Sequence, residues 1–293
     1  MDTKGINGTI DLSGQIALIT GGGRGLGRVV AWALASAGAA VIVLARSTSQ
    51  LAETVALVEV EGGQAFALTV DVTDGQAVRQ AVGEIIAQVG PVDLLVNNAG
   101  LAKPFGPTWE IDPEEWWRCV EVNLRGALLC SLAVLPGMVS RHRGRIINMV
   151  SDAGTIAIPH GSAYVISKTA LIRFTENLAS ETDEHGISVF AMIPGTVRTP
   201  MTEEMLDIPE VQRYAPWFQE IFDQGLDVPP EECARLALEL ASGRADALSG
   251  CCLSITDDIS ELVKQATLVR EKNLYTLRMG RLDQAATLEG EVD

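Results

Sequence analysis

A tyrosine and a lysine four residues apart are the clearest candidates for chemistry in this sequence. Tyr164 and Lys168 lie in the run YVISKTALIRFTENLA, whose pattern predicts a helix, and their spacing places both side chains on one helix face. A phenol with a pKa of ~10 is a poor acid or base at neutral pH, but a neighbouring ammonium group favours the phenolate and lowers that pKa. Tyr164 could then act as a general acid–base, with the Ser151 hydroxyl brought to the same oxygen by the loop before the helix. The same spacing also fits a helix that carries one tyrosine and one lysine on a solvent-exposed face.

A glycine-rich turn near the N-terminus has the form of a phosphate-binding site. The segment TGGGRGLG, residues 20–27, follows a short apolar run at 16–20 and precedes a predicted helix at 25–37. A strand, a tight glycine turn and a helix N-terminus can together bind the pyrophosphate of a dinucleotide. The glycines let the backbone approach the phosphates, because no Cβ stands in the way.

Strand-like and helix-like segments alternate along the rest of the chain. Apolar runs predict strands at 40–45, 65–70, 92–96, 146–150, 187–193 and 250–256, and helical periodicity predicts helices at 48–61, 74–89, 113–140, 164–179 and 230–241. This alternation predicts an α/β fold with a single doubly wound parallel sheet, Rossmann-like, with helices on both faces and a C-terminal helical extension. We expect a single dinucleotide-binding catalytic domain over residues 1–293, with a core at about 12–256, a lid at about 200–228 and an extension at 257–293.

Several motifs in a fixed order make the chain resemble a known family. After the glycine-rich turn come NNAG at 97–100, Asn123 in EVNLRG, the Tyr164–Lys168 pair and PGTVRTP at 194–200. With these motifs the chain, from about residue 12 to 256, resembles the short-chain dehydrogenase/reductase family, in the branch with TGxxxGxG and YxxxK motifs. The resemblance implies that Asn123 bends its helix and holds a water in a proton relay. The catalytic residues that it implies are Asn123, Ser151, Tyr164 and Lys168.

The same resemblance implies a set of cofactor contacts along the chain. NNAG would line the adenosine ribose and brace the sheet, Asp71 would meet the adenine amino group, and the turn at 194–197 would pack on the nicotinamide. By its chemistry alone, Asp71 is equally well explained as a helix cap in DVTD. The implied cofactor-binding residues are Gly21, Arg24, Gly25, Leu26, Gly27, Arg46, Asp71, Val72, Asn97, Ala99, Gly100, Tyr164, Lys168, Pro194, Gly195, Val197 and Thr199.

The end of the second predicted strand indicates which dinucleotide is preferred. Sites for NAD(H) commonly carry an acid there for the ribose 2′-hydroxyl, whereas NADP(H) sites carry a cation for the 2′-phosphate. Here the sequence reads Ala45-Arg46-Ser47, without an acid, and Arg24 in the glycine-rich turn can reach the same phosphate. We therefore expect NADP(H) rather than NAD(H), with the alternative that Arg46 is only solvated.

The composition argues against several other classes of function. A formal net charge of −16 and a pI near 4.6 oppose binding to nucleic acid or to an anionic membrane, because the field of the protein repels phosphate. The five cysteines and three histidines show no metal-ligand or redox spacing, so we expect no metal site and buried thiols in a reducing compartment. The first residues lack the basic start and apolar core of a signal peptide, which favours a cytoplasmic protein. The uncharged run at 29–45 is divided by Gly38 into a helix and a strand, so we do not expect it to span a membrane.

The C-terminal part departs from the resembled family. Residues 200–228 combine apolar side chains with many acids and are interpreted as a mobile lid, while Thr256-Asp257-Asp258 replaces the family's Asp-Gly-Gly-like turn. An amphipathic segment follows at 259–274, and the last dozen residues have the composition of a polar tail. The apolar stripe of the segment consists of Ile259, Leu262, Val263, Ala266 and Val269. We expect this stripe to pack against a neighbouring subunit of a homo-oligomer, a dimer or a tetramer.

These observations predict an NADP(H)-dependent oxidoreductase that interconverts a carbonyl and a secondary alcohol on a largely apolar small molecule by hydride transfer. One alternative is a non-catalytic dinucleotide-binding protein, although such a protein could afford to lose the Asn/Ser/Tyr/Lys set. Another is an epimerase or dehydratase, whose relatives tend to have larger C-terminal substrate domains. A third is a 3-oxoacyl-thioester (carrier-linked) reductase, since Arg141, Arg143 and Arg145 could dock an acidic carrier, although the acidic lid opposes it.

Overall fold

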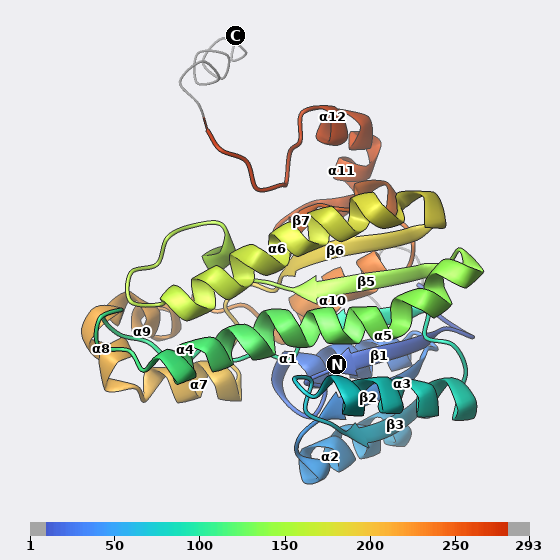
Figure 1. The fold of residues 1–293 in the computed structure, drawn as a ribbon, viewed down its shortest axis with the longest axis horizontal. Helices are drawn as coiled ribbons and strands as arrows, with labels where there is room; N and C mark the ends of the chain where they lie inside the picture. Colours follow the sequence, from blue (N-terminus) through green and yellow to red (C-terminus); the bar gives the residue numbers. More distant parts are fainter. Residues whose placement is uncertain (1–9, 281–293) are drawn as a thin grey trace.

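The structure is a computed structural model that describes residues 10–280, and it contains one parallel sheet of seven strands (Figure 1). The strands are β1 (Ile16–Thr20), β2 (Ala40–Ala45), β3 (Gln64–Thr69), β4 (Leu94–Asn97), β5 (Gly144–Met149), β6 (Ile187–Ile193) and β7 (Cys252–Ser254). Their order in the sheet is β3-β2-β1-β4-β5-β6-β7, and all neighbouring strands are parallel. The predicted α/β fold is therefore confirmed.

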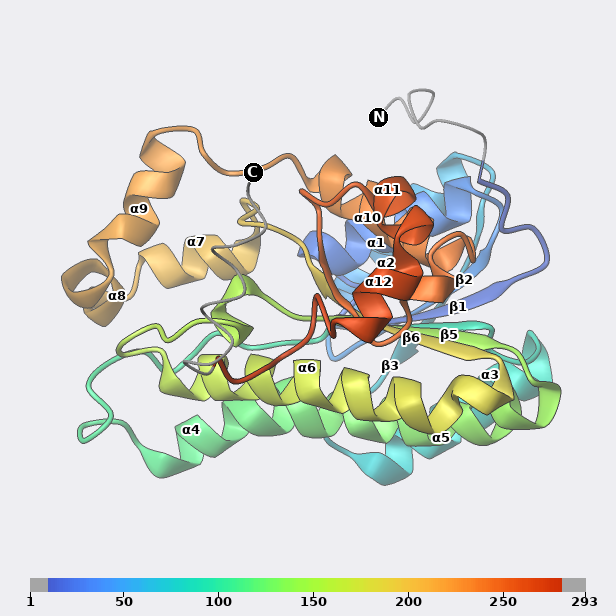
Figure 2. The ribbon, with the colours of Figure 1, turned by 90° about the horizontal axis from the view of Figure 1, so that it is seen from above.

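Helices cover both faces of the sheet (Figure 2). One layer contains α3 (Gly75–Gln88), α4 (Pro113–Val120), α5 (Gly126–Arg141) and α6 (Ser162–Thr182). The other contains α1 (Gly25–Ser36), α2 (Thr48–Val60), α10 (Pro230–Ala241), α11 (Ile259–Lys264) and α12 (Ala266–Glu271). Beyond the carboxyl ends of the strands lie the helices of the expected lid, α7 (Pro200–Leu206), α8 (Pro209–Tyr214) and α9 (Pro216–Asp223).

Burial on both faces explains why the strands are apolar runs rather than alternating ones. Every residue of β6 is buried, as are the central residues of β2. One hydrophobic cluster joins the sheet to α1 and α10, and another joins it to α3 and α5. The helices thus fix the positions of the strand ends, and the strand ends carry the site.

The strand order reverses between β1 and β4, and a hydroxyl group joins the two strand ends. Thr20 closes β1; its Oγ1 donates to the Val96 carbonyl oxygen at 3.4 Å and accepts from the backbone N–H of Asn98 at 3.0 Å. In open α/β sheets, ligands bind outside the carboxyl ends of the strands at such a switch point.

Three predicted elements differ from the structure by more than a shift of a few residues at an end. The helix expected at 113–140 is interrupted by a π-helical turn, Glu121–Arg125, and continues to Arg141. The strand expected at 250–256 is only three residues long, because the Asp257 carboxylate accepts from the Ser254 backbone N–H at 2.7 Å and turns the chain. The amphipathic segment expected at 259–274 is not one continuous helix but two short ones, α11 and α12.

The apolar stripe of the C-terminal extension packs on the chain's own core, so the expectation that it needs a neighbouring subunit is wrong. Ile259 and Val269 are buried in the cluster that contains α10, and the other members of the stripe pack against it. The sequence pattern showed that the stripe must be buried, but not that the surface beside α10 was free to receive it. Self-association remains a prediction that no longer rests on this stripe. The polar tail and the first nine residues lie outside the described part of the chain.

One helical stretch among the described residues, Pro113–Arg141, is long and apolar enough to cross a membrane, with a mean hydropathy of 1.6 over its most apolar window. It comprises α4, the π-helical turn and α5, and it packs between α3 and α6 (Figure 2). Its place in this helical layer accounts for its hydropathy.

Candidate active site

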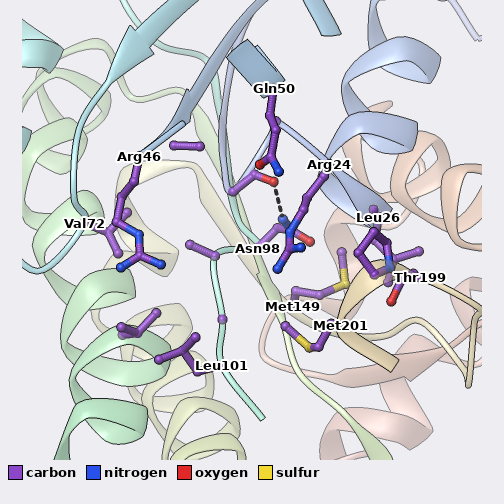
Figure 3. A pocket seen from close by; sticks show the side chains of 18 of the residues that line it. Arg24, Leu26, Arg46, Gln50, Val72, Asn98, Leu101, Met149, Thr199 and Met201 are labelled. Carbon is purple, nitrogen blue, oxygen red and sulfur yellow. Dashed lines mark hydrogen bonds between the residues drawn. The ribbon is translucent and has the colours of Figure 1, made fainter. Parts of the chain in front are cut away.

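A cavity of about 480 Å³ lies at the carboxyl ends of the strands, where the strand order reverses (Figure 3). It extends from the glycine-rich turn and the end of β2 to the start of α6 and the first lid helix. The predicted cofactor-binding residues that line it are Gly21, Arg24, Gly25, Leu26, Arg46, Asp71, Val72, Ala99, Gly100, Tyr164, Lys168, Pro194 and Thr199.

The glycine-rich turn is held by its neighbours so that its backbone faces the cavity. Gly21 has a φ of +66°, and a Cβ there would lie 2.8 Å from Asn98 Nδ2. Thr54 Oγ1 donates to the Gly22 carbonyl oxygen at 2.9 Å, and Arg28 Nε donates to that of Gly23 at 3.1 Å. These bonds hold the carbonyl groups of the turn beneath it, which leaves the following helix N-terminus directed at the cavity.

The N-terminus of α1 is open to an anion. Its N-cap residue, Arg24, makes no side-chain capping bond, and its first turn contains no acid. The unpaired N–H groups and the helix dipole therefore favour a negative group at this point. Gly25 faces Thr199 across the turn, since a Cβ on it would lie 3.7 Å from Thr199 Cβ.

Two arginines bring positive charge to the same cavity (Figure 3). Arg46 follows β2 and has no hydrogen-bond or ion-pair partner in the described part of the chain, whereas Arg24 donates from Nη1 to Glu204 Oε1 at 2.7 Å. Figure 3 shows both guanidinium groups projecting into the cavity, Arg46 on the side of Val72 and Arg24 on the side of Thr199. No acid follows β2 to receive a ribose hydroxyl, as the sequence indicated.

Tyr164 and Lys168 lie one turn apart on α6 and both line the cavity. The Ser151 hydroxyl, just after β5, hydrogen-bonds the Tyr164 phenol. Lys168 is 4% exposed; its ammonium group lies 5.6 Å from the centre of the Tyr164 ring and donates to the Met149 carbonyl oxygen at 2.7 Å. The structure thus brings together the serine, tyrosine and lysine that the sequence placed in one site.

The acid–base properties of this group differ from those expected. Burial raises the pKa of the Tyr164 phenol above 10.0, and the hydrogen bond from Ser151 acts in the opposite direction. We expected Lys168 to lower that pKa, but burial of the phenol dominates and the direction is upward. The Lys168 ammonium group donates to a carbonyl oxygen instead. Burial lowers the pKa of Lys168 itself to about 8. Burial therefore favours the protonated phenol, which is the form that can donate a proton.

Asn123 sits in the π-helical turn, 1% exposed, behind the catalytic group. Its Oδ1 accepts from the backbone N–H of Leu101 at 2.7 Å, and its Nδ2 donates to the Leu101 carbonyl oxygen at 2.9 Å and to Ser167 Oγ at 2.8 Å. A Cβ on Gly100 would lie 3.3 Å from Asn123 Oδ1 and 3.8 Å from Lys168 Nζ, so these groups are neighbours. A π-helical turn is often found at a functional site, and here it aims one side chain at the loop after β4.

Four predicted cofactor residues do not line the cavity. Gly27 and Gly195 shape the turns behind it, and Val197 is buried. Asn97, at the end of β4, points under the sheet, where its Nδ2 donates to Asn148 Oδ1 at 2.8 Å and to Ser131 Oγ at 3.3 Å. It braces the sheet, as the resemblance implies, and it does not line the cavity.

The next residue, Asn98, lines the cavity in its place. Its Nδ2 donates to the Thr20 carbonyl oxygen at 2.9 Å. Successive residues of a strand point to opposite faces. If Asn97 points under the sheet, the alternation makes Asn98 the candidate that faces the cavity. Sequence reasoning also missed Gln50 and Met201, which come from α2 and the lid and carry no motif.

The burial of Lys168 predicts how the stability of the protein depends on pH. Its pKa is about 8 in the folded protein against 10.5 when exposed, so between these values the unfolded chain binds more protons. The free energy of unfolding should therefore rise with pH in this window, by at most about 1.4 kcal/mol per pH unit. In Lys168→Met this contribution is absent, so wild type should gain stability relative to the variant above pH 8 and not below it. Urea unfolding of both proteins across this range measures the difference, and a difference that does not change with pH would contradict the buried, titrating ammonium group.

The cavity has one end suited to phosphates and one suited to acid–base chemistry. A nicotinamide dinucleotide fits this donor set: the open N-terminus of α1 and the arginines would hold its phosphates, and the Lys168 ammonium group offers a further donor. At the other end, Tyr164 lines the cavity and the Ser151 hydroxyl is hydrogen-bonded to its phenol.

Comparison with known proteins agrees with this geometry. The family model described as short chain dehydrogenase matches residues 15–208. A short chain dehydrogenase of Pseudocercospora fijiensis is 33% identical over 294 residues, which cover 92% of this chain and 91% of the relative. Galactitol 2-dehydrogenase of Rhizobium johnstonii is 36% identical over 252 residues, which cover 83% of this chain and 94% of the relative.

Solved structures with the same fold include two dehydrogenases. A short-chain type dehydrogenase/reductase from Mycobacterium marinum superposes with a TM-score of 0.76 at 33% identity, over 84% of this chain and 94% of that one. A gluconate 5-dehydrogenase from Burkholderia cenocepacia, in complex with NADP and tartrate, has a TM-score of 0.76 at 31% identity, over 84% of this chain and 95% of that one. The matched regions include the glycine-rich turn and the Tyr164–Lys168 pair. The chain therefore belongs to the short-chain dehydrogenase family of NAD(P)-dependent oxidoreductases, which act on alcohol and carbonyl groups.

Proposed function

We propose that the protein is an NADP(H)-dependent oxidoreductase that interconverts a carbonyl and a secondary alcohol on a largely apolar small molecule. The observation that carries the cofactor preference is Arg46, which follows β2, projects into the cavity and has no partner in the described chain (Figure 3). A cation at this position matches a 2′-phosphate, whereas a 2′-hydroxyl would call for an acid. The relative from Burkholderia cenocepacia, solved with NADP, is consistent with this choice.

Each step of the proton transfer is assigned to a residue of this chain. In the direction of reduction, the bound cofactor supplies the hydride, with its electron pair, to the carbonyl carbon. The Tyr164 hydroxyl donates its proton to the carbonyl oxygen, and its raised pKa keeps that proton in place at neutral pH. The Ser151 hydroxyl hydrogen-bonds the reacting oxygen and orients the phenol. Lys168 and Asn123 complete the proton path to solvent, and Asn123 holds the loop that carries Leu101.

The walls near Tyr164 support an apolar substrate. Leu101, Met149, Val150 and Met201 are apolar residues that line the cavity, and Met149 and Val150 directly precede Ser151. The lid helices add a separate apolar cluster, formed by Met205, Val211 and Ala215 with Phe105 packed against it. Two relatives carry names that include a polyol and a sugar acid, so polar substrates belong in any test.

Arg46→Ala should raise the KM for NADPH at least tenfold and leave the KM for NADH almost unchanged. The substitution removes a charge-assisted partner of the 2′-phosphate, which is worth about 1.5–3 kcal/mol. Steady-state kinetics with both cofactors measure the effect, and NADH is the internal control because it lacks the phosphate. If the ratio of the two KM values does not change, Arg46 does not read the cofactor.

The reaction itself is tested by a substrate panel. NADPH oxidation should be measured with aliphatic and aryl ketones, with aldehydes, with keto sugar acids and with 3-oxoacyl thioesters. We expect the highest kcat/KM among the apolar ketones. Activity confined to the sugar acids would overturn the apolar substrate, and activity confined to the thioesters would favour the carrier-linked reductase.

A further inference from the structure

An ion pair connects the cofactor-binding turn to the first helix of the lid. Arg24, the N-cap residue of α1, donates from Nη1 to Oε1 of Glu204, which lies on α7, at 2.7 Å. The two residues are 180 positions apart in the sequence, and they meet where Gly25 approaches Thr199. The glycine-rich turn and the lid are thus joined by a charge contact beside the cavity.

The contact means that one of the two cavity arginines is paired with a carboxylate and the other is not. Arg46 has no partner in the described chain, while the guanidinium group of Arg24 is engaged by a carboxylate. Both groups project into one cavity (Figure 3), so a phosphate group held by Arg46 would attract Arg24 as well. The Glu204 carboxylate engages Nη1 of Arg24, so it and a phosphate group would compete for the same guanidinium group.

We propose that Glu204 is a specificity-determining residue that competes with the 2′-phosphate of NADP(H) for Arg24. This inference rests on the proposed NADP(H) preference. The carboxylate lowers the affinity for NADP(H), and phosphate binding exchanges one ion pair for another, which releases α7 from the glycine-rich turn. NAD(H), which lacks the phosphate, leaves the pair between Arg24 and Glu204 in place.

The exposure of the pair sets the size of the effect. The side chains of Arg24 and Glu204 are 43% and 47% exposed. Such a pair is worth at most about 1 kcal/mol, so its loss corresponds to a change in affinity of at most about fivefold. A phosphate group is the stronger partner for arginine, because it carries more charge than a carboxylate. When NADP(H) binds, Arg24 therefore exchanges its ion pair with Glu204 for one with the 2′-phosphate.

The test measures binding by isothermal titration calorimetry with NADP⁺, NAD⁺ and adenosine 2′,5′-bisphosphate. Glu204→Gln should tighten the binding of NADP⁺ and of the bisphosphate by about two- to fivefold and leave NAD⁺ unchanged. Glu203→Gln is the matched control, since it removes the same charge from the same exposed helix without touching Arg24. The control should leave all three affinities as in wild type; an equal gain from Glu203→Gln would show a general charge effect and overturn the proposal.

A second background separates competition from direct repulsion. In Arg24→Gln, NADP⁺ should bind more weakly, and adding Glu204→Gln should produce no further gain. If the gain from Glu204→Gln persists without Arg24, the carboxylate acts on the phosphate directly and the competition is ruled out.

The outcomes distinguish this inference from the function on which it rests. If wild type binds NAD⁺ as tightly as NADP⁺, the proposed cofactor preference itself is wrong. If wild type prefers NADP⁺ but Glu204→Gln changes both affinities equally, the preference stands and Glu204 acts only as a latch of the lid. Only a gain confined to the two phosphate-bearing ligands supports the competition.

Discussion

Tyr164→Phe is expected to lower kcat by about 10²- to 10⁴-fold while the cofactor still binds with nearly unchanged affinity. The substitution removes only the hydroxyl that donates the proton. The ring remains on α6, over the Lys168 ammonium group, so the shape of the cavity is kept. Steady-state rates with the best substrate of the panel, together with calorimetry of cofactor binding, measure the two parts of this prediction.

The control for this variant is Tyr275→Phe. Tyr275 lies in the C-terminal extension and is used through its backbone carbonyl group, which the substitution leaves intact. This variant also loses a phenol hydroxyl, but elsewhere in the chain, so its kcat should equal that of wild type. A rate for Tyr164→Phe within a few-fold of wild type would show that another group supplies the proton.

Gly27→Ala is expected to lower the free energy of unfolding by about 1–3 kcal/mol and to weaken cofactor binding severely. A Cβ at Gly27 would lie 2.5 Å from Asn98 Nδ2 and 2.9 Å from the Gly21 carbonyl carbon. Neither neighbour can move freely, because one is backbone and the other is bonded to the Thr20 carbonyl oxygen. The turn must therefore shift, and the phosphate-binding geometry shifts with it.

The same substitution in an open helix should have the opposite sign. Gly83 lies in the middle of α3, and a Cβ there would meet nothing within 4 Å. Gly83→Ala should raise the free energy of unfolding by up to about 1 kcal/mol, because alanine has the higher helix propensity. Urea unfolding of both variants compares them directly. The two changes in the free energy of unfolding need not be equal in size. An unchanged free energy of unfolding in Gly27→Ala would contradict the tight packing of the turn.

Sequence patterns located the sheet well because its strands are buried on both faces. Such strands are continuous apolar runs, which the sequence shows directly, whereas the order of the strands, with β1 beside β4 at the switch point, comes from the structure. The Tyr164–Lys168 pair followed from helix geometry alone. The motifs therefore identified both ends of the cavity before any contact was known.

What the sequence could not predict depends on contacts between distant residues. Arg24 and Glu204 are far apart in the chain, and no pattern near either predicts that they meet. The direction of the pKa of Tyr164 depends on how deeply the phenol is buried and on the carbonyl oxygen that binds Lys168. The sequence also could not show which of two neighbouring asparagines faces the cavity at the end of β4: Asn98 lines it, while Asn97 is bonded to Asn148.

The C-terminal extension also determines how the sheet ends. β7 is an edge strand, and an edge strand offers free backbone groups to which a strand of another chain can add. Here the Cys252 N–H donates to the Tyr275 carbonyl oxygen at 2.7 Å, and the Leu277 N–H donates to Glu176 Oε1 at 2.7 Å. Leu277 packs on the cluster under α6. The extension therefore shields its own sheet from the edge-to-edge aggregation to which an uncovered β7 would be exposed, and proteolytic loss of residues 275–277 would remove that protection while sparing every residue that lines the cavity.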